Sequence, residues 1–240
     1  YLETKQYSSL CELLNHAESV IALHGGDQQS KNKTHRLART MAGRFSSIEE
    51  VEGKDLHSFL KKLGSAKTVQ AGFLLAIEFA KKCFTGVADA LTAGTKRGEV
   101  ANLRKGTKYP LVLQAANDYL NNPTSDHLKV FFLALKTNPE TSAYRRDLLY
   151  RFLCVLKMHV DGEGVTLVEA GVRYQREMRH TGRPISHQKL IGTTLLVKGL
   201  EYDHAVILNA DALDAKDLYV AMTRGSKSLT IIGTSRHLPA

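Results

Sequence analysis

The segment KLIGTTLLVKGLEYDHAVILNADALDAKDLYVAMTRGSKSLTIIGT, residues 189–234, contains the pattern that decides the fold. Three apolar runs within it predict strands, KLIGTTLLV, AVILN and SLTIIGT. Between the last two runs, apolar residues at helical spacing predict a helix over residues 215–224. Strands that alternate with helices are typical of an α/β fold with a parallel sheet.

The helix expected over residues 215–224 has recognisable start and stop signals. Asp214 and Asp217 are both candidate N-caps, and Gly225 stands where a C′ glycine would close the helix. The buried stripe is expected to consist of Leu218, Ala221 and Met222. Arg224 in the last turn fits two roles, a cation stabilised at the helix C-terminus or an arginine finger that neutralises charge on a transferring phosphoryl group.

The tetrapeptide Lys-Gly-Leu-Glu links the first two expected strands. Lys198 and Gly199 are expected to end the first strand, where glycine would let the backbone approach a ligand closely. Glu201 would then lie at the tip of the sheet, where α/β folds place ligand-contacting groups. Taken alone, the tetrapeptide also fits a solvated turn.

The front of the chain predicts the rest of the sheet. SVIALHGG, residues 19–26, has the pattern of a short buried strand, with helices expected over residues 8–17 and 34–44 on either side. From about residue 47 to residue 179, nearly every segment has helical period and lacks strand signals. This order favours a parallel α/β sheet interrupted by a helical insertion. Three segments are expected, the sheet segments 1–46 and 186–240 and the insertion 47–185.

Composition favours a nucleic-acid partner and a reducing compartment. The net charge of +9 and the pI near 9.4 favour an anionic partner, of which nucleic acid is the commonest. The three cysteines are far apart and form no CxxC pair, which argues against a disulfide framework or zinc knuckle and indicates the cytoplasm. The histidines show no metal-ligand spacing, and no apolar run approaches the roughly 20 residues of a membrane helix.

The sequence lacks the GxxxxGK[ST] P-loop with which many nucleoside triphosphatases hold phosphates. The nearest candidate, IALHGGDQQSKNKTH, has a glycine pair after a strand, but no Gly-Lys-Ser/Thr follows. A turn after a buried strand explains the pair better. We therefore expect this chain alone to bind nucleotide weakly and to hydrolyse none.

KGLEYD followed by LYVAMTRGSKSL resembles motifs V and VI of the UvrD/Rep-like superfamily 1 DNA helicases, in the same order. The specific match covers about residues 193–233, and the rest of the chain fits by architecture alone. The resemblance implies a RecA-like parallel-sheet lobe, the second lobe of these helicases (domain 2A), interrupted by a mostly helical, 2B-like insertion. It also implies that the chain is part of an ATP-dependent DNA helicase or translocase.

The resemblance implies a role for each matched position. Arg224 would be the catalytic arginine that contacts the nucleotide γ-phosphate across the cleft between the lobes. Glu201 would hydrogen-bond the nucleotide sugar, and Gly199 would belong to the same nucleotide site. The loop that links this site to the DNA would contain Thr193, Thr194 and Lys198. One position departs from the family, because Leu195 stands where a histidine usually touches the DNA backbone.

The implied cofactors are ATP and Mg²⁺. The missing first lobe, the N-terminal RecA-like lobe of the same parent protein, would supply the phosphate-binding lysine, the Mg²⁺ ligands and the water-activating glutamate. The other implied partner is single-stranded or partly duplex DNA, and no membrane is expected. A further surface for DNA phosphates is expected in the basic helical stretch GVRYQREMRHTGRP, through Arg173, Arg176 and Arg179.

Two alternatives stay open at this point. The first is a basic DNA-binding or protein-interaction module that keeps a degenerate helicase lobe without motor activity. The second is the same lobe within a helicase–nuclease complex, in which a partner subunit supplies the nuclease, since the sequence shows no nuclease motif. A P-loop and an acidic Mg²⁺ motif upstream in the parent gene would favour the motor.

Overall fold

A computed structural model of the chain describes residues 19–25, 28–41, 43–48, 53–162, 165–181 and 187–235, apart from the side chains of residues 28 and 179–181. The helix expected over residues 8–17 lies outside these ranges. The chain divides into two compact units, which we call the sheet unit (residues 1–48 and 186–240) and the helical unit (residues 49–185). The sequence predicts the first boundary at 46/47, and the structure has it at 48/49.

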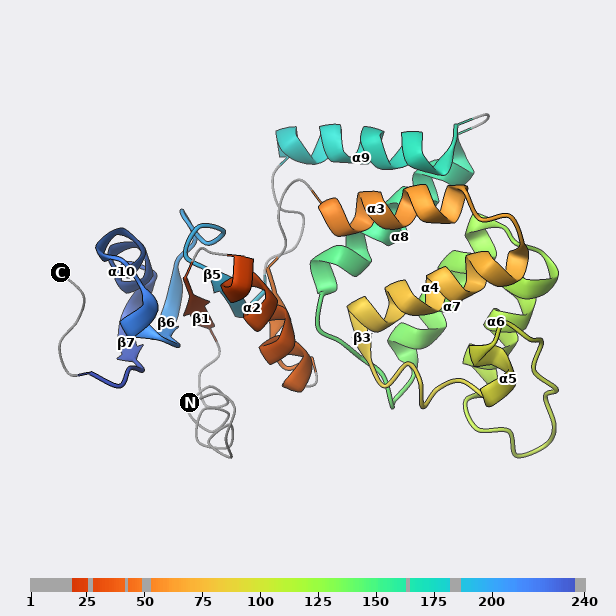
Figure 1. Cartoon of the computed structure of the whole chain (residues 1–240), viewed down its shortest axis with the longest axis horizontal. Helices are drawn as coiled ribbons and strands as arrows, with labels where there is room; N and C mark the ends of the chain where they lie inside the picture. The colour runs from red at the N-terminus through yellow and green to blue at the C-terminus, as the bar shows by residue number, and fades with distance from the viewer. Residues whose placement is uncertain are drawn as a thin grey trace. The chain divides into compact units, whose positions relative to one another are not determined.

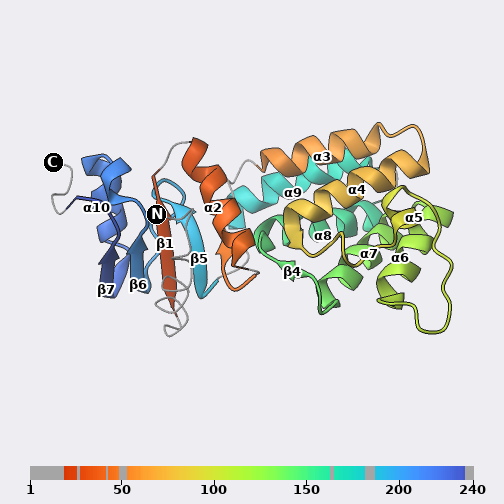
Figure 2. The same ribbon diagram turned by 60° about the horizontal axis from the view of Figure 1, so that its bottom comes forward.

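The sheet unit is built on five parallel strands in the order β2-β5-β1-β6-β7. Figure 2 shows β7, β6, β1 and β5 side by side. The strands are β1 Val20–His24, β2 Ser46–Ser47, β5 Lys189–Thr193, β6 Tyr202–Ile207 and β7 Gly225–Ile231. Because the strands are parallel, their carboxyl ends share one edge of the sheet and their amino ends share the other. The expected α/β class with a parallel sheet is confirmed.

β1 lies at the centre of this sheet and is buried along its whole length. Its register pairs Ile21 with Leu190 of β5 on one side and with Ala205 of β6 on the other. Helices α2 (Gln28–Thr40) and α10 (Ala215–Met222) lie on opposite sides of the strands (Figure 1). A parallel strand covered on both faces is expected to be apolar at successive positions, as the run VIAL is here.

Helix α2 is displaced from the range that the sequence predicts. It begins at Gln28 and ends at Thr40, whereas the apolar pattern predicts residues 34–44. The inward positions of its first turns are polar, because Ser30 and Thr34 are both buried. The first turns of α2 bury serine and threonine side chains in place of apolar ones. Apolar periodicity therefore could not locate the start of this helix.

Helix α10 differs from expectation at its C-terminal end. Leu218 and Ala221 are buried in the core of the sheet unit as expected, but Met222 is 40% exposed and does not belong to the buried stripe. The helix ends at Met222, and Gly225 begins β7, so Gly225 is not the C′ residue. A Cβ on Gly225 would lie 2.9 Å from the amide nitrogen of Ala205. Glycine at this position therefore allows β7 to approach β6 closely.

The helical unit consists of helices and one pair of two-residue strands. The helices are α3 Lys54–Gly64, α4 Val69–Cys83, α5 Ala93–Lys96, α6 Pro110–Asn121, α7 Ser125–Thr137, α8 Arg146–Asp161 and α9 Leu167–Thr181. The strand β3 (Phe84–Thr85) pairs antiparallel with β4 (Ser142–Ala143), from which α5, α6 and α7 separate it in the chain. The sequence predicts no strand in this region, because two residues are too few to show strand alternation.

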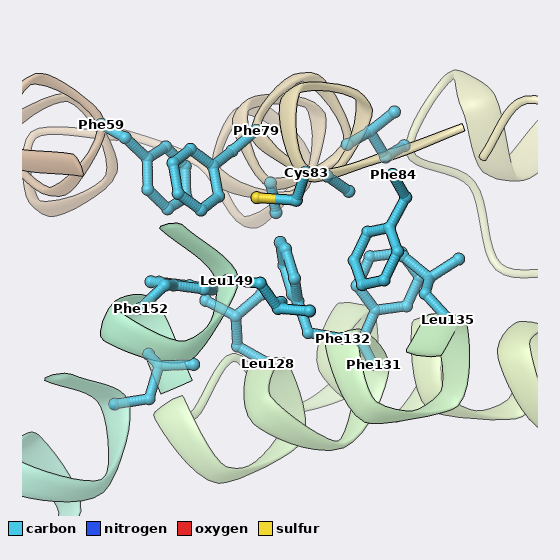
Figure 3. Packing of buried hydrophobic residues seen from close by; sticks show 14 of the residues in the cluster. Phe59, Phe79, Cys83, Phe84, Leu128, Phe131, Phe132, Leu135, Leu149 and Phe152 are labelled. Carbon is cyan, nitrogen blue, oxygen red and sulfur yellow. The ribbon is translucent and has the colours of Figure 1, made fainter. Parts of the chain in front are cut away.

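A cluster of aromatic rings from different helices forms the centre of the helical unit (Figure 3). The ring of Phe132 in α7 lies with its centroid 4.8 Å from that of Phe152 in α8 and 5.7 Å from that of Phe131. The ring of Phe79 in α4 meets Phe152 edge-on at 5.0 Å. Each such pair adds about 0.5–1.5 kcal/mol to the free energy from area burial. The rings therefore join α4, α7 and α8.

Asp55 of α3 forms two ion pairs in the helical unit. Its carboxylate accepts a hydrogen bond from Nη2 of Arg145 at 2.7 Å and another from Nζ of Lys82 at 3.0 Å. Burial raises the pKa of Asp55, but the positive charges of Arg145 and Lys82 outweigh this effect and hold the pKa below its usual value. A lowered folded-state pKa stabilises the fold above the unfolded-state value of about 3.9, and the stabilisation is lost as the pH falls through the folded-state value.

We expect Asp55→Asn to lower the free energy of unfolding by about 2 kcal/mol at pH 7, because it removes the carboxylate from the buried Arg145 side chain. The Asp55 side chain is 41% exposed, so solvent screening keeps the effect at the low end for an ion pair. Urea unfolding at pH 7 and at about pH 2.5 measures the effect, which should shrink at the lower pH. Glu78→Gln, which removes an exposed pair with Lys81, is the control. An equal loss at both pH values would contradict the assignment.

Candidate functional site

Glu201 and Arg224 are neighbours at the amino-terminal edge of the sheet. Glu201 directly precedes β6 and Arg224 directly precedes β7, and the first residues of these strands, Tyr202 and Gly225, pair with each other. The sequence predicts Glu201 at the ligand-binding tip, which in open parallel sheets is the carboxyl-terminal edge. That placement is wrong, because β5 ends at Thr193 and the chain returns to the opposite edge before β6 begins.

The guanidinium of Arg224 connects the two sequence motifs directly. Its Nη1 donates a hydrogen bond to the carbonyl oxygen of Leu200 at 2.8 Å, and its Nε donates to the carbonyl oxygen of Val220 at 3.0 Å. Its Nη2 donates to the hydroxyl of Thr223 at 2.8 Å. The main chain adds a further link, because the amide of Tyr202 donates to the carbonyl oxygen of Arg224 at 2.9 Å. Arg224 therefore ties the end of α10 to the Lys-Gly-Leu-Glu segment.

The Lys-Gly-Leu-Glu segment presents exposed side chains at this edge. Lys198 and Glu201 are both exposed, and their side chains form no hydrogen bond or ion pair with any described residue. Gly199 has a φ of 87°, in the left-handed region, and a Cβ there would meet no atom within 4 Å. The positive φ gives this glycine a conformational reason as well, beside the expected close approach of a ligand to the backbone, which stays a prediction. Glycine reaches this turn geometry without the strain that other residues would incur.

Thr193 and Thr194 lie at the opposite, carboxyl-terminal edge, and both are buried. The amide of Val197 donates to the carbonyl oxygen of Thr193 at 3.2 Å, so the apolar run predicted as strand turns back at this point. The Thr194 amide donates to the carbonyl oxygen of His24 at 3.0 Å, and the Thr194 hydroxyl donates to Oδ1 of Asp217 at 2.6 Å. These contacts fix the turn to β1 and to the start of α10.

Asp217, which the sequence offers as one of two candidate N-caps of α10, has a different role in the structure. The cap of α10 is Asp214, whose carboxylate accepts a hydrogen bond from the amide of Asp217 at 2.7 Å. Asp217 is thus free of the capping role and bonds Thr194 instead. An aspartate three residues after the cap was the only local signal, and it does not identify a partner in another segment of the chain.

The basic stretch forms the exposed side of α9 in the helical unit. Ala170, Tyr174 and Met178 are buried at the spacing of one helix face, while Arg173 and Arg176 are exposed. Arg173 pairs with Glu177 at 3.4 Å, and both side chains are well exposed, so the pair contributes little to stability. Arg179 belongs to α9, but its side chain lies outside the described residues. Leu195, at the position of the family's histidine, is 64% exposed.

The structure thus separates the candidate residues into three groups. Gly199, Glu201 and Arg224 lie together with Lys198 at the amino-terminal edge of the sheet. Thr193 and Thr194 lie at its carboxyl-terminal edge. The arginines of α9 belong to the helical unit. The segment from Thr194 to Glu201 is the covalent connection between the two edges of the sheet.

The amino-terminal edge presents one hydrogen-bond acceptor and one cationic donor side by side. The exposed Glu201 carboxylate is a hydrogen-bond acceptor suited to sugar hydroxyls, and Arg224 is a donor suited to phosphate oxygens. A guanidinium has five N–H donors. Three Arg224 nitrogens each make one hydrogen bond within the protein, which leaves donor capacity for an anion. No group of three His, Cys, Asp or Glu side chains in the described part of the chain could hold a metal ion.

Across the residues that the structure describes, none of the helices is both long and apolar enough to cross a bilayer. Comparison of the sequence with protein-family models and with curated proteins gives no match.

Proposed function

We propose that the chain is the second RecA-like lobe, with its helical insertion, of an ATP-dependent DNA helicase or translocase. The supporting observation is the hydrogen bond from Arg224 Nη1 to the carbonyl oxygen of Leu200, beside Glu201. Two separate segments that resemble helicase motifs V and VI meet through it at one sheet edge. The bond joins Arg224 to the main chain of the Lys-Gly-Leu-Glu segment, so the Glu201 side chain remains available to a ligand at the same edge.

In this proposal each group at the edge has one task. Bound ATP supplies the free energy of phosphoryl transfer, and Mg²⁺ is held by the other lobe. Glu201 accepts a hydrogen bond from the sugar, and Arg224 donates to the terminal phosphate, where negative charge increases during transfer. The carbonyl oxygens of Leu200 and Val220 hold the guanidinium in place before nucleotide arrives. Arg224 is thus positioned before nucleotide binds, and the N–H groups that bond the protein are not available to the phosphate.

The segment from Thr194 to Glu201 provides a physical connection between nucleotide and DNA sites. Its first residue is bonded to Asp217 at the start of α10, and its last residue is the proposed sugar-binding carboxylate. The buried Thr193 and Thr194 would transmit a change of position, and the exposed Lys198 would be the direct contact with a DNA phosphate. A change at either end of this segment would be felt at the other through α10.

The test is DNA-stimulated ATP hydrolysis by the complete protein that contains this chain. We expect single-stranded DNA to raise the turnover of ATP, and the 240-residue chain alone to hydrolyse none, because it has no P-loop lysine. A steady-state phosphate-release assay with and without DNA measures both. Hydrolysis by the isolated chain would contradict the proposal that it forms only half of the nucleotide site. A complete protein without DNA-stimulated turnover would contradict the proposed motor function.

One observation favours a second candidate function, a non-motor DNA-binding or protein-interaction module on the same lobe. Arg224 makes three side-chain hydrogen bonds to the protein itself, which is enough to explain an arginine at this position structurally. In that case the net charge of +9 would serve DNA binding without ATP hydrolysis. The two candidates differ in the same assay, because only the motor couples DNA to ATP turnover.

The exposed arginines of α9 give a separate prediction about DNA. We expect the double variant Arg173→Ala and Arg176→Ala to weaken binding of a single-stranded oligonucleotide about tenfold at low salt. It should also reduce the slope of log affinity against log salt by about 1.4, since each lost phosphate contact contributes about 0.7. Fluorescence anisotropy across a salt series measures both. The control is the double variant Arg104→Ala and Lys105→Ala, which removes two exposed cations from the segment between α5 and α6. An equal effect of both double variants would show general charge attraction instead of a contact surface.

A further inference from the structure

The helical unit contains a cavity of about 340 Å³ at a place that the sequence does not single out. It lies between the turn that joins α3 to α4, the turn that joins α6 to α7, and the start of α9. Its apolar wall includes Leu63, Leu128 and Leu167. Its polar wall includes Lys67, Thr68, Tyr119, Thr124 and Ser125. The volume is within the range of small-molecule pockets, about 300–1,000 Å³.

Three helix N-termini meet at this cavity. Val69, Ser125 and Leu167, which line it, are the first residues of α4, α7 and α9, helices of 15, 13 and 15 residues. Thr68 caps α4 and Thr124 caps α7, each through one hydrogen bond to a first-turn amide, at 3.1 and 3.2 Å. Other first-turn amides have no partner within their helix, and the helix dipole adds positive potential. Such a place attracts an anion.

Tyr119 is an independent sign of a ligand. Its side chain is only 6% exposed, yet its hydroxyl forms no hydrogen bond with any described residue. The hydroxyl lies beside the first turn of α4, since a Cβ on Gly72 would be 3.2 Å from it, and both residues line the cavity. Burial raises the pKa of Tyr119, so the hydroxyl stays protonated and can donate. The hydroxyl therefore lines the cavity as a donor without a protein partner, available to an acceptor bound there.

The charges around the cavity also favour an anion. Lys67 is exposed and forms no ion pair with a described residue. The nearby acidic residue Glu169 accepts hydrogen bonds from the amide and hydroxyl of Thr166, at 2.8 and 2.7 Å, which turn its carboxylate to the helix cap. Asp126 in the first turn of α7 is exposed and does not line the cavity. The lining therefore contains a cation and hydroxyl donors but no carboxylate.

We propose that this cavity binds a small molecule with a phosphate group and an apolar part, such as the phosphate monoester of an aromatic or branched alcohol. The phosphate accepts hydrogen bonds from Tyr119 and the first-turn amides and meets the charge of Lys67. The apolar part packs on the leucine wall. The phosphate alone would contact only the polar wall of the cavity, and the apolar part alone would contact only the leucine wall. This assignment does not depend on the helicase proposal.

Isothermal titration of the 240-residue chain with phenyl phosphate tests the proposal. We expect phenyl phosphate to bind at least about tenfold more tightly than either inorganic phosphate or benzyl alcohol, each of which meets one wall only. Tyr119→Phe keeps the ring and is expected to raise the Kd for phenyl phosphate about tenfold or more, since it removes a charge-assisted hydrogen bond. Lys67→Ala should raise the Kd less, and only at low salt.

Lys62→Ala, which removes an exposed lysine that does not line the cavity, is the matched control and should leave the Kd unchanged. Amide shifts in NMR spectra of the wild-type chain should change at Val69, Ser125 and Leu167, and this measurement stands even if a variant does not fold. Several results would overturn the proposal: no saturable binding, shifts confined to other residues, or an unchanged Kd in a folded Tyr119→Phe variant. Displacement of phenyl phosphate by a short oligonucleotide would overturn the small-molecule assignment.

Discussion

Arg224→Ala in the complete protein is expected, under the proposed helicase function, to lower ATP turnover by about 10³-fold or more, because an arginine finger contributes that much to phosphoryl transfer. Arg224→Lys should recover little, since the single nitrogen of an ammonium cannot occupy the separate positions from which Nη1 and Nε bond Leu200 and Val220. The turnover number under saturating ATP and DNA measures the effect. Nucleotide affinity should change far less, because the charge that Arg224 meets develops mainly in the transition state.

A structural role for Arg224 makes a different prediction for the same variants. Loss of its hydrogen bonds to Leu200 and Val220 would lower the free energy of unfolding by about 1–3 kcal/mol without a special effect on turnover. Thermal unfolding of each variant separates the two effects. Lys227→Ala is the control, since Lys227 lies at the start of β7 in an exposed pair with Asp203. Near-normal turnover in a folded Arg224→Ala variant would reject the finger role.

Phe132→Ala is expected to lower the free energy of unfolding of the helical unit by about 3–5 kcal/mol. The ring is completely buried and contacts Phe131, Phe152, Phe79 and Phe84, so its removal leaves a cavity that three helices cannot fill without moving. Urea unfolding followed by circular dichroism at 222 nm reports mainly on this helix-rich unit. A loss of that size is enough to unfold many domains under ordinary conditions.

The matched control for this core variant is Leu111→Ala. Leu111 is also apolar and also lies in a helix of the helical unit, but it is 75% exposed. Its replacement should change the free energy of unfolding by less than about 0.5 kcal/mol. Similar losses in Phe132→Ala and Leu111→Ala would mean that the aromatic cluster is not the core. If the sheet unit unfolds separately, its transition should be the same in both variants.

The fold was largely predictable because its elements have strong local patterns. The expected strands SVIALHGG and KLIGTTLLV contain β1 and β5, which are buried almost throughout. The expected strand AVILN overlaps only the second half of β6, which is the buried half. The prediction failed where an apolar run did not mean a strand. Leu196 and Val197 continue the run of β5 but belong to a turn packed on the same core, and apolar content alone does not separate the two cases.

The candidate site was predictable as a set of residues but not as an arrangement. Glu201 and Arg224 were identified by motif resemblance, and the structure places them beside each other through the pairing of Tyr202 with Gly225. The bond from Thr194 to Asp217 and the unbonded hydroxyl of the largely buried Tyr119 have no local signal. Both depend on which distant segments meet, and hydrophobic periodicity contains no information about that.

By itself the sequence determined a parallel α/β sheet and a separate helical core, because apolar periodicity and turn residues act over a few neighbouring positions. It also determined which polar residues stand out from that pattern. Only the tertiary structure decided that Glu201 lies at the amino-terminal edge, that Arg224 is bonded to Leu200, and that three helix starts share one cavity. The order of the strands, the edge at which a residue lies and the meeting of helix starts all depend on contacts between segments far apart in the chain. The packing free energy of such contacts depends on several segments at once, so no single segment of sequence determines it.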